Sequence, residues 1–188
     1  MIKTSHKKLL LGAGGIIVVA LCFWAGSSDN KNLLQTDNLS STPDYFITKI
    51  HATEFGQDGK LIETLTADKG LHYNKGARTL LENPKVKRVE KTGNWEAQGK
   101  KGIIEDGSSD ILLTDDASAI KHYVDSPDIT LKADNIRYLD KKQSLTSTGN
   151  ARIYSTQGET TADVIVTYIN TEEVKMTGSV RGQYEATH

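Results

Sequence analysis

The chain has 188 residues, of which 37% are hydrophobic and 25% are charged, with a formal net charge of -1 at pH 7. Its 23 basic and 24 acidic residues are interleaved, so the sequence lacks the basic stripe that nucleic-acid-binding proteins carry. The part that follows residue 26 is long enough for one domain with its own core. It contains no cysteine, since the only one is Cys22, so this core cannot depend on disulfides.

An uncharged stretch, LLLGAGGIIVVALCFWAG, runs from Leu9 to Gly26 and follows three lysines within the first eight residues. A helix of these residues is about 27 Å long, close to the thickness of a bilayer's hydrocarbon core. Because positive charge precedes the span, we predict that residues 1–8 are cytoplasmic and that residues 9–26 form a single transmembrane helix. The remainder of the chain then lies outside the cytoplasm.

Two processed forms of this N-terminus are alternatives to a retained anchor. A secretory signal cut after Ala25 would place bulky Phe23 where a small residue is wanted. A lipidated Cys22 would have bulky neighbours, Leu21 and Phe23, which suit that processing badly. The residues therefore favour the anchor, and the polar run over residues 27–43 predicts a flexible tether.

From residue 44 onward, apolar residues recur at every second position in short runs between turns, which is typical of an all-β fold. In the first run, Phe46, Thr48, Ile50 and Ala52 are expected to share the inward face, because side chains alternate along a strand. Gly59 suits the turn to the next strand, which runs from residue 61 to residue 73. The later predicted strands are 79–81, 86–89, 95–99, 111–113, 117–123, 129–138, 145–148, 151–154, 162–169 and 174–184.

A weak internal repeat joins these strands into pairs. Its core is Ala-Asp followed by an aromatic residue, as in Ala67-Asp68 to Tyr73, Ala133-Asp134 to Tyr138 and Ala162-Asp163 to Tyr168, with a degenerate copy at Ala97. These alanines are separated by 30, 36 and 29 residues along the chain. Stacked strand pairs bury a continuous interior and leave the first and last strands unpaired. The recurring aspartates are expected to cap strand ends through Asx-type hydrogen bonds.

Patterns that carry catalysis or bind metals are weak in this sequence. His51, His72 and His122 are scattered without an H-x-H or H-E-x-x-H spacing, and no G-x-S-x-G motif is present. The glycines of residues 12–15 lie inside the predicted span, where no strand precedes them as a nucleotide-binding loop requires. We therefore expect no enzyme activity, no bound metal and no cofactor.

The anchor, the repeated Ala-Asp and tyrosine pattern, the turn from Gly56 to Leu61, the run Leu80-Leu81-Glu82-Asn83-Pro84 and the ending from Val180 to Glu185 occur in a characteristic order. In this order they resemble LptC, the membrane-anchored periplasmic family of the lipopolysaccharide export bridge in Gram-negative bacteria. The resemblance implies an open twisted β-jellyroll over residues 44–188, located in the periplasm and attached to the inner membrane by a single pass. It also implies an apolar groove for the acyl chains of lipopolysaccharide.

The resemblance further implies transfer of lipopolysaccharide from an ATP-driven inner-membrane extractor of LptB, LptF and LptG to LptA, a soluble periplasmic jellyroll. It matches Ile50, Leu81 and Val174 to groove-facing sites, and Gly59 and Gly149 to glycine-bearing turns. The residues expected to line the groove are Phe46, Ile50, Leu65, Ala67, Leu81, Ala97, Leu113, Leu131, Ala133, Ile153, Val166, Val174 and Met176. The residues expected at the partner-binding edges are Phe46, Thr48, Ile50, Ala52, Val174, Met176, Val180 and Tyr184.

One alternative remains open at this point. An alternating apolar face is also what a packed core looks like, and a protein with such a core needs no lipid in its interior. The chain would then be a membrane-tethered structural scaffold of an envelope complex that conducts no lipid.

Overall fold

The computed structural model describes residues 42–184, so the predicted anchor, Cys22 and nearly all of the tether lie outside the described residues. The described part is an all-β fold, as predicted, with one 3₁₀ turn at Asn74–Gly76. Among residues 42–184 there is no helix of the length and apolar character that a bilayer crossing requires. The strands are β1 (Tyr45–Phe55), β2 (Leu61–Tyr73), β3 (Arg78–Glu82), β4 (Lys85–Glu90), β5 (Gly93–Gln98), β6 (Lys101–Glu105), β7 (Ile111–Tyr123), β8 (Ile129–Leu139), β9 (Ser144–Ser155), β10 (Gly158–Tyr168), β11 (Val174–Thr177) and β12 (Arg181–Tyr184).

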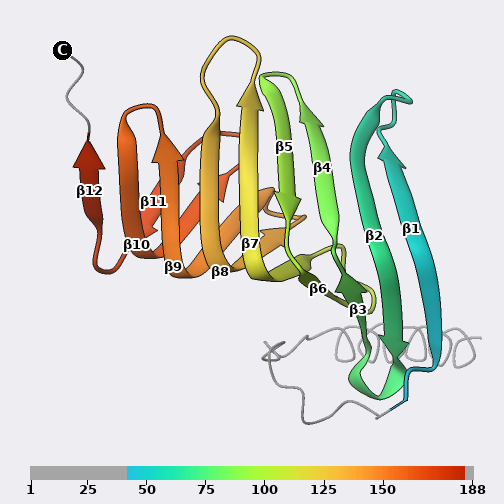
Figure 1. Ribbon diagram of the computed structural model, residues 1–188. Helices are drawn as coiled ribbons and strands as arrows, with labels where there is room; N and C mark the ends of the chain where they lie inside the picture. Colours follow the sequence, from blue (N-terminus) through green and yellow to red (C-terminus); the bar gives the residue numbers. More distant parts are fainter. Residues whose placement is uncertain (1–41, 185–188) are drawn as a thin grey trace, which may run out of the picture. The chain divides into compact units, whose positions relative to one another are not determined.

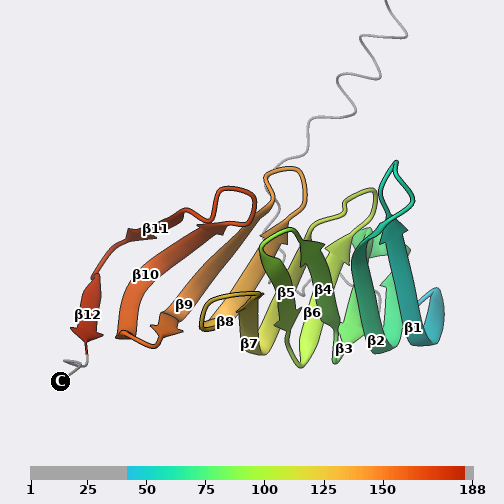
Figure 2. The ribbon, with the colours of Figure 1, turned by 90° about the horizontal axis from the view of Figure 1, so that it is seen from above.

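The strands form one continuous antiparallel sheet in which neighbours in the chain are mostly neighbours in space (Figures 1 and 2). Three pairs of short strands each take the place of one long strand. β3 and β4 both pair with β2, β5 and β6 both pair with β7, and β11 and β12 both pair with β10. Within the described residues, β1 is therefore one edge of the sheet, and β11 with β12 is the other.

A line of backbone irregularities crosses this sheet near the middle of the strands. Positive φ angles occur at Lys49 in β1, at Asp115 and Asp116 in β7 and at Asn150 in β9, and Asn83 has one between β3 and β4. The register shifts at the same level between β7 and β8, between β8 and β9 and between β9 and β10. Irregularities of this kind bend a strand and reverse the alternation of its side chains. Each long strand is thus divided into two segments.

The segments on the two sides of this line form two walls. The β3 wall consists of β3, β6, β11 and residues 45–48, 69–73, 111–114, 135–139, 144–148 and 164–168. The β4 wall consists of β4, β5, β12 and residues 50–55, 61–67, 117–123, 129–133, 151–155 and 158–162. The core lies between the walls, and Leu113 and Ile136 of one wall and Ala119 and Leu131 of the other have no exposed surface.

The line of irregularities corrects the inward face predicted for the first strand. Ile50 and Ala52 pair with Ala67 and Leu65 on the inner face, as expected. Across the positive-φ residue Lys49 the alternation reverses, so it is Ile47 that lies opposite buried Gly70. Phe46 and Thr48 therefore point outward, and Phe46 is 65% exposed.

Several predicted strand boundaries also change. The predicted strands 111–113 and 117–123 are the two segments of β7, and 145–148 and 151–154 are the two segments of β9. The predicted strand 174–184 is instead divided into β11 and β12. β6 was not predicted, because its sequence KGIIE carries only two adjacent apolar residues and shows no alternation.

Candidate functional site

Each wall presents a continuous row of residues to the interior, and the strand register defines both rows. In the β3 wall the row runs Ile47, Gly70, Leu81, Gly102, Leu113, Ile136, Ser147, Ile165 and Met176. In the β4 wall it runs Ala52, Leu65, Val86, Ala97, Ala119, Leu131, Ile153, Thr160 and Gly182. The interior, which we call the trough, is therefore lined from one edge strand to the other and is almost wholly apolar.

The repeated alanines and aspartates mark the closed side of the trough, where the walls join. Asp68 accepts a hydrogen bond from Asn83 Nδ2 at 2.8 Å, and Asp134 accepts one from Asn150 Nδ2 at 3.0 Å. Asp163 accepts one from Ser179 Oγ at 3.3 Å. Each aspartate thus lies inside a long strand, beside the irregularity of its neighbour, and does not cap a strand end as predicted.

Gly149 likewise lies inside β9 and not in a turn. It has φ +73, and a Cβ added to it would lie 2.5 Å from Asp134 Oδ2. Gly59 does lie in the predicted turn, between β1 and β2, and its amide donates to Gly56 O at 2.9 Å. It has φ +77, but a Cβ there would meet no atom within 4 Å.

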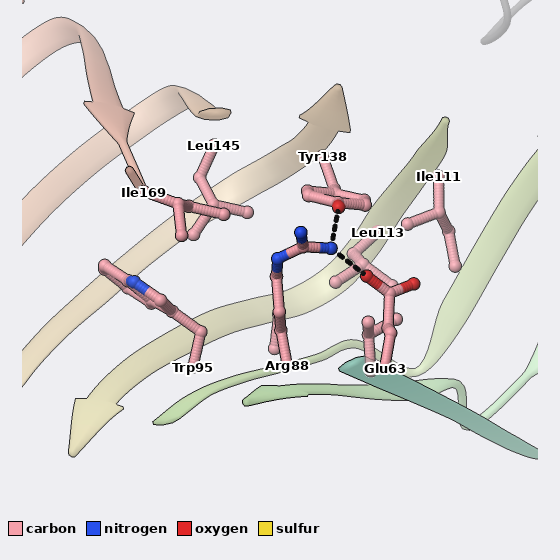
Figure 3. A pocket seen from close by; sticks show the side chains of 10 residues that line it. Glu63, Arg88, Trp95, Ile111, Leu113, Tyr138, Leu145 and Ile169 are labelled. Carbon is pink, nitrogen blue, oxygen red and sulfur yellow. Dashed lines mark hydrogen bonds and ion pairs between the residues drawn. The ribbon is translucent and has the colours of Figure 1, made fainter. Parts of the chain in front are cut away.

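The side of the trough away from these irregularities, which we call the mouth, carries a polar network centred on Arg88 (Figure 3). Arg88 donates to Glu63 Oε2 at 3.1 Å and to Glu90 Oε1 at 3.0 Å, both in its own β4 wall. It also donates at 2.9 Å to Tyr138 Oη, which belongs to the β3 wall. Tyr138 Oη in turn donates to Asp140 Oδ1 at 3.1 Å. The network therefore crosses from one wall to the other.

Burial shapes the protonation of this network. It raises the pKa of Glu63, and the favourable contacts of this carboxylate with Arg88 and Tyr138 offset that rise only in part. It also raises the pKa of the Tyr138 hydroxyl, with the charge of Glu63 acting in the same direction, so this hydroxyl stays protonated. Burial alone would lower the pKa of Arg88, but its hydrogen bonds to the carboxylates of Glu90 and Glu63 raise it. Arg88 is therefore a permanent cation.

A second polar cluster lies at the mouth around Lys121, whose side chain is only 1% exposed. Its Nζ donates to Thr92 Oγ1 at 3.1 Å and lies 3.8 Å from Glu172 Oε1. Thr92 Oγ1 also lies within 2.6 Å of that carboxylate oxygen. The amine stands over the rings of Trp95 and Tyr123, at 5.8 and 5.4 Å from their centroids, where cation–π attraction stabilises it. Because Glu172 follows β10 at the end of the β3 wall, this cluster also joins the two walls.

Very little free volume remains beneath these clusters. The cavity between Arg88, Trp95, Tyr138, Leu145 and Ile169 measures about 20 Å³. That is room for one water molecule. Here the protein's own side chains fill the trough, whereas a hollow of about 430 Å³ is open beside Ile153 and Thr160, near β12.

The predicted groove residues fall into three groups. Ala67, Leu81, Ala97, Leu113, Leu131 and Ala133 are buried in the core, and Ile50, Leu65, Ile153 and Met176 pack against it while partly exposed. Phe46 and Val166 lie on the outer face, and Val174 lies at the edge with 36% exposure. Val166 is outside because the shift after Ala162 turns Ile165 inward in its place.

Sequence reasoning missed Trp95, Tyr138 and Ile169, although all three line the cavity. For Tyr138 a signal was present in the repeat. It follows its alanine by five residues, whereas Tyr73 and Tyr168 follow theirs by six. The inward and outward alternation of side chains reverses once after each of these alanines. A tyrosine five residues after its alanine therefore points inward, whereas one six residues after it points outward.

The predicted partner-edge residues lie at the two edges of the sheet, apart from Val180, which stands between β11 and β12. Tyr184 ends β12, is 71% exposed and pairs with Gly158. Within the described residues, histidine, cysteine and carboxylate side chains form no group of three that would hold a metal ion.

Comparisons with known proteins agree with this architecture. The crystal structure of LptH, described as the LptA homologous periplasmic component of the conserved lipopolysaccharide transport device from Pseudomonas aeruginosa, superposes with a TM-score of 0.54. The two chains are 9% identical, and the match covers 66% of this chain and 95% of that one, so it shows a shared fold. No curated protein sequence matches the chain. Residues 15–185 match the family described as "Lipopolysaccharide-assembly, LptC-related", and the chain therefore belongs to that family.

Proposed function

We propose that this protein binds lipopolysaccharide in the trough and passes it from the inner-membrane extractor to the soluble periplasmic jellyroll. The observation that carries the proposal is the pair of interior rows, which line the trough without a break from β1 to β11 and β12. Membership of a family of lipopolysaccharide assembly supports the same cargo. We propose a carrier and no catalytic role.

The hydrophobic effect explains why such a carrier is needed. Each buried CH₂ group is worth about 0.8 kcal/mol, so several acyl chains cannot cross an aqueous compartment uncovered. The trough would cover the chains, while the sugars remain in water outside the mouth. Contacts of this type have no preferred direction, so the cargo can slide along the rows towards either edge.

The two edges of the sheet suit docking by strand addition. An edge strand offers unpaired backbone groups, and a partner strand that joins it extends both sheets into one. We propose that β1 meets the extractor of LptB, LptF and LptG, and that β11 and β12 meet LptA. LptH, described as an LptA homologous component, shares this fold, so such a contact would join two similar jellyrolls. A single N-terminal pass in the inner membrane would hold the domain in the periplasm.

The alternative of a structural scaffold is favoured by one observation, the cavity of only about 20 Å³ in the middle part of the trough. A scaffold needs a filled core, whereas a carrier needs an interior that lipid can enter. The two functions therefore differ in whether lipid contacts the inner rows.

Site-specific photocrosslinking in cells distinguishes them. Leu131 and Lys132 are adjacent in β8, and Leu131 is buried in the trough while Lys132 is exposed on the outer face. A photoreactive residue at Leu131 is expected to capture lipopolysaccharide, and one at Lys132 is not. Equal capture at the two positions, or capture at neither, would exclude the carrier and leave the scaffold.

A further inference from the structure

If acyl chains pass along the trough, as proposed above, its walls have to separate in the middle part. A dry apolar cavity that binds a molecule as small as benzene has a volume of about 150 Å³. The cavity beneath the mouth measures about 20 Å³, and Leu113, Leu131 and Ile136 fill the interior beside it. The hollow of about 430 Å³ beside Ile153 and Thr160 lies near β12. An acyl chain is larger than benzene, so it cannot enter the middle part of the trough without movement of the walls.

The direction of that movement follows from the strand connections. On the closed side the two walls are segments of the same strands, joined through Lys49, Asp116 and Asn150. The walls can therefore part only at the mouth, with the line of irregularities as the hinge. The contacts that connect the two walls at the mouth therefore control their separation.

Three polar contacts connect the walls there. Arg88 donates to Tyr138 Oη at 2.9 Å, Lys121 lies 3.8 Å from Glu172, and Thr92 Oγ1 lies 2.6 Å from the same carboxylate. We propose that these five residues form a latch that holds the trough shut until lipid arrives. Acyl chains enter when the latch opens and the walls separate.

The composition of the latch makes its opening reversible. When the walls part, Arg88 keeps Glu63 and Glu90, and Lys121 keeps Thr92, since these pairs lie within the β4 wall. Tyr138 keeps Asp140 within the β3 wall. Arg88 is thus not left as an unpaired buried charge, which is the costly outcome when an ion pair is broken. Lys121 loses its carboxylate but keeps the rings of Trp95 and Tyr123 as well as the Thr92 hydroxyl. Separation therefore breaks only the contacts between the walls.

A matched ion pair that does not cross the mouth provides the control. Arg152 donates to Glu159 at 3.0 Å, and both residues belong to neighbouring strands of the β4 wall. Loss of this ion pair removes a contact of similar geometry but leaves the contacts between the two walls in place. Glu159→Gln is therefore the control variant.

Pulsed electron paramagnetic resonance on the full chain measures the opening directly. Spin labels replace Lys91 and Lys142, two exposed residues in the β4–β5 and β8–β9 turns on opposite walls, and Cys22→Ser removes the native thiol. The latch variant combines Tyr138→Phe, which keeps the ring, with Glu172→Ala, which removes the carboxylate shared by Lys121 and Thr92. Without any lipid, we expect this variant to populate longer label distances than the wild type and the control.

An unchanged distance distribution in the latch variant, with native circular dichroism, would overturn the latch. Addition of purified lipopolysaccharide to the wild type tests whether lipid opens the latch. A longer distance on binding supports the latch, while binding at an unchanged distance contradicts it. Widening in the lipid-free latch variant, together with no lipopolysaccharide binding in any variant, would leave the latch standing and defeat the proposed function.

Discussion

Gly149 and Gly59 share a positive φ but differ in their surroundings. A Cβ on Gly149 would meet Asp134 at 2.5 Å, whereas one on Gly59 would meet nothing within 4 Å. We expect Gly149→Ala to lower the free energy of unfolding by about 3 kcal/mol, from backbone strain together with the clash. Gly59→Ala carries the strain alone and should cost about 1 kcal/mol. Chemical denaturation of both variants measures the difference, and equal losses would show that the close approach at Gly149 is unimportant.

The buried carboxylate of Glu63 gives the stability a defined pH dependence. Because burial raises its pKa in the folded state, ionised Glu63 destabilises the fold at neutral pH, and its protonation restores stability as the pH falls. Glu63→Gln has no such proton to bind. We therefore expect the wild type to gain stability relative to Glu63→Gln as the pH is lowered from 7 towards 4.5. Unfolding midpoints across this range test it, and a wild type that loses stability relative to the variant would contradict it.

At the scale of the strands, alternation and turn residues predicted the all-β class and most strand positions. They failed where a long strand bends. Alternation holds within a segment and reverses at each irregularity, which is why Phe46 and Val166 were assigned to the wrong face. The reversal depends on backbone angles at residues such as Lys49, whose type gives no warning. The mouth was missed for another reason, since Arg88 and Tyr138 are 50 residues apart in sequence.

The contact between β8 and β9 at the bend gives a prediction about coupling. If the Asp134 side chain causes the clash at position 149, its removal should make room for a methyl group. We expect Gly149→Ala to cost about 1 kcal/mol less in an Asp134→Ala background than in the wild type. A double-mutant cycle of unfolding free energies provides the number. If the losses of the two single variants simply add in the double variant, the cost of Gly149→Ala comes from backbone strain and not from the clash with Asp134.

Across the whole β domain, one arrangement serves several purposes. A single antiparallel sheet bent along its middle gives two walls, two free edges and an interior that reaches both edges. The bend needs small or positive-φ residues on the closed side, which the Ala-Asp repeat and its partner strands supply. The mouth carries the largely buried charges of Arg88 and Lys121, and their contacts connect the walls. The same fold can thus be shut when empty and open when loaded.

The central claim is that hydrocarbon, and not sugar, is held between the walls. Binding of intact lipopolysaccharide and of its fully deacylated saccharide to the purified full chain tests this most directly. We expect the intact molecule to bind and the deacylated saccharide to show no measurable binding, because the inner rows of Leu81, Leu113 and Leu131 offer only apolar contacts. Equal binding of the two molecules would contradict the account.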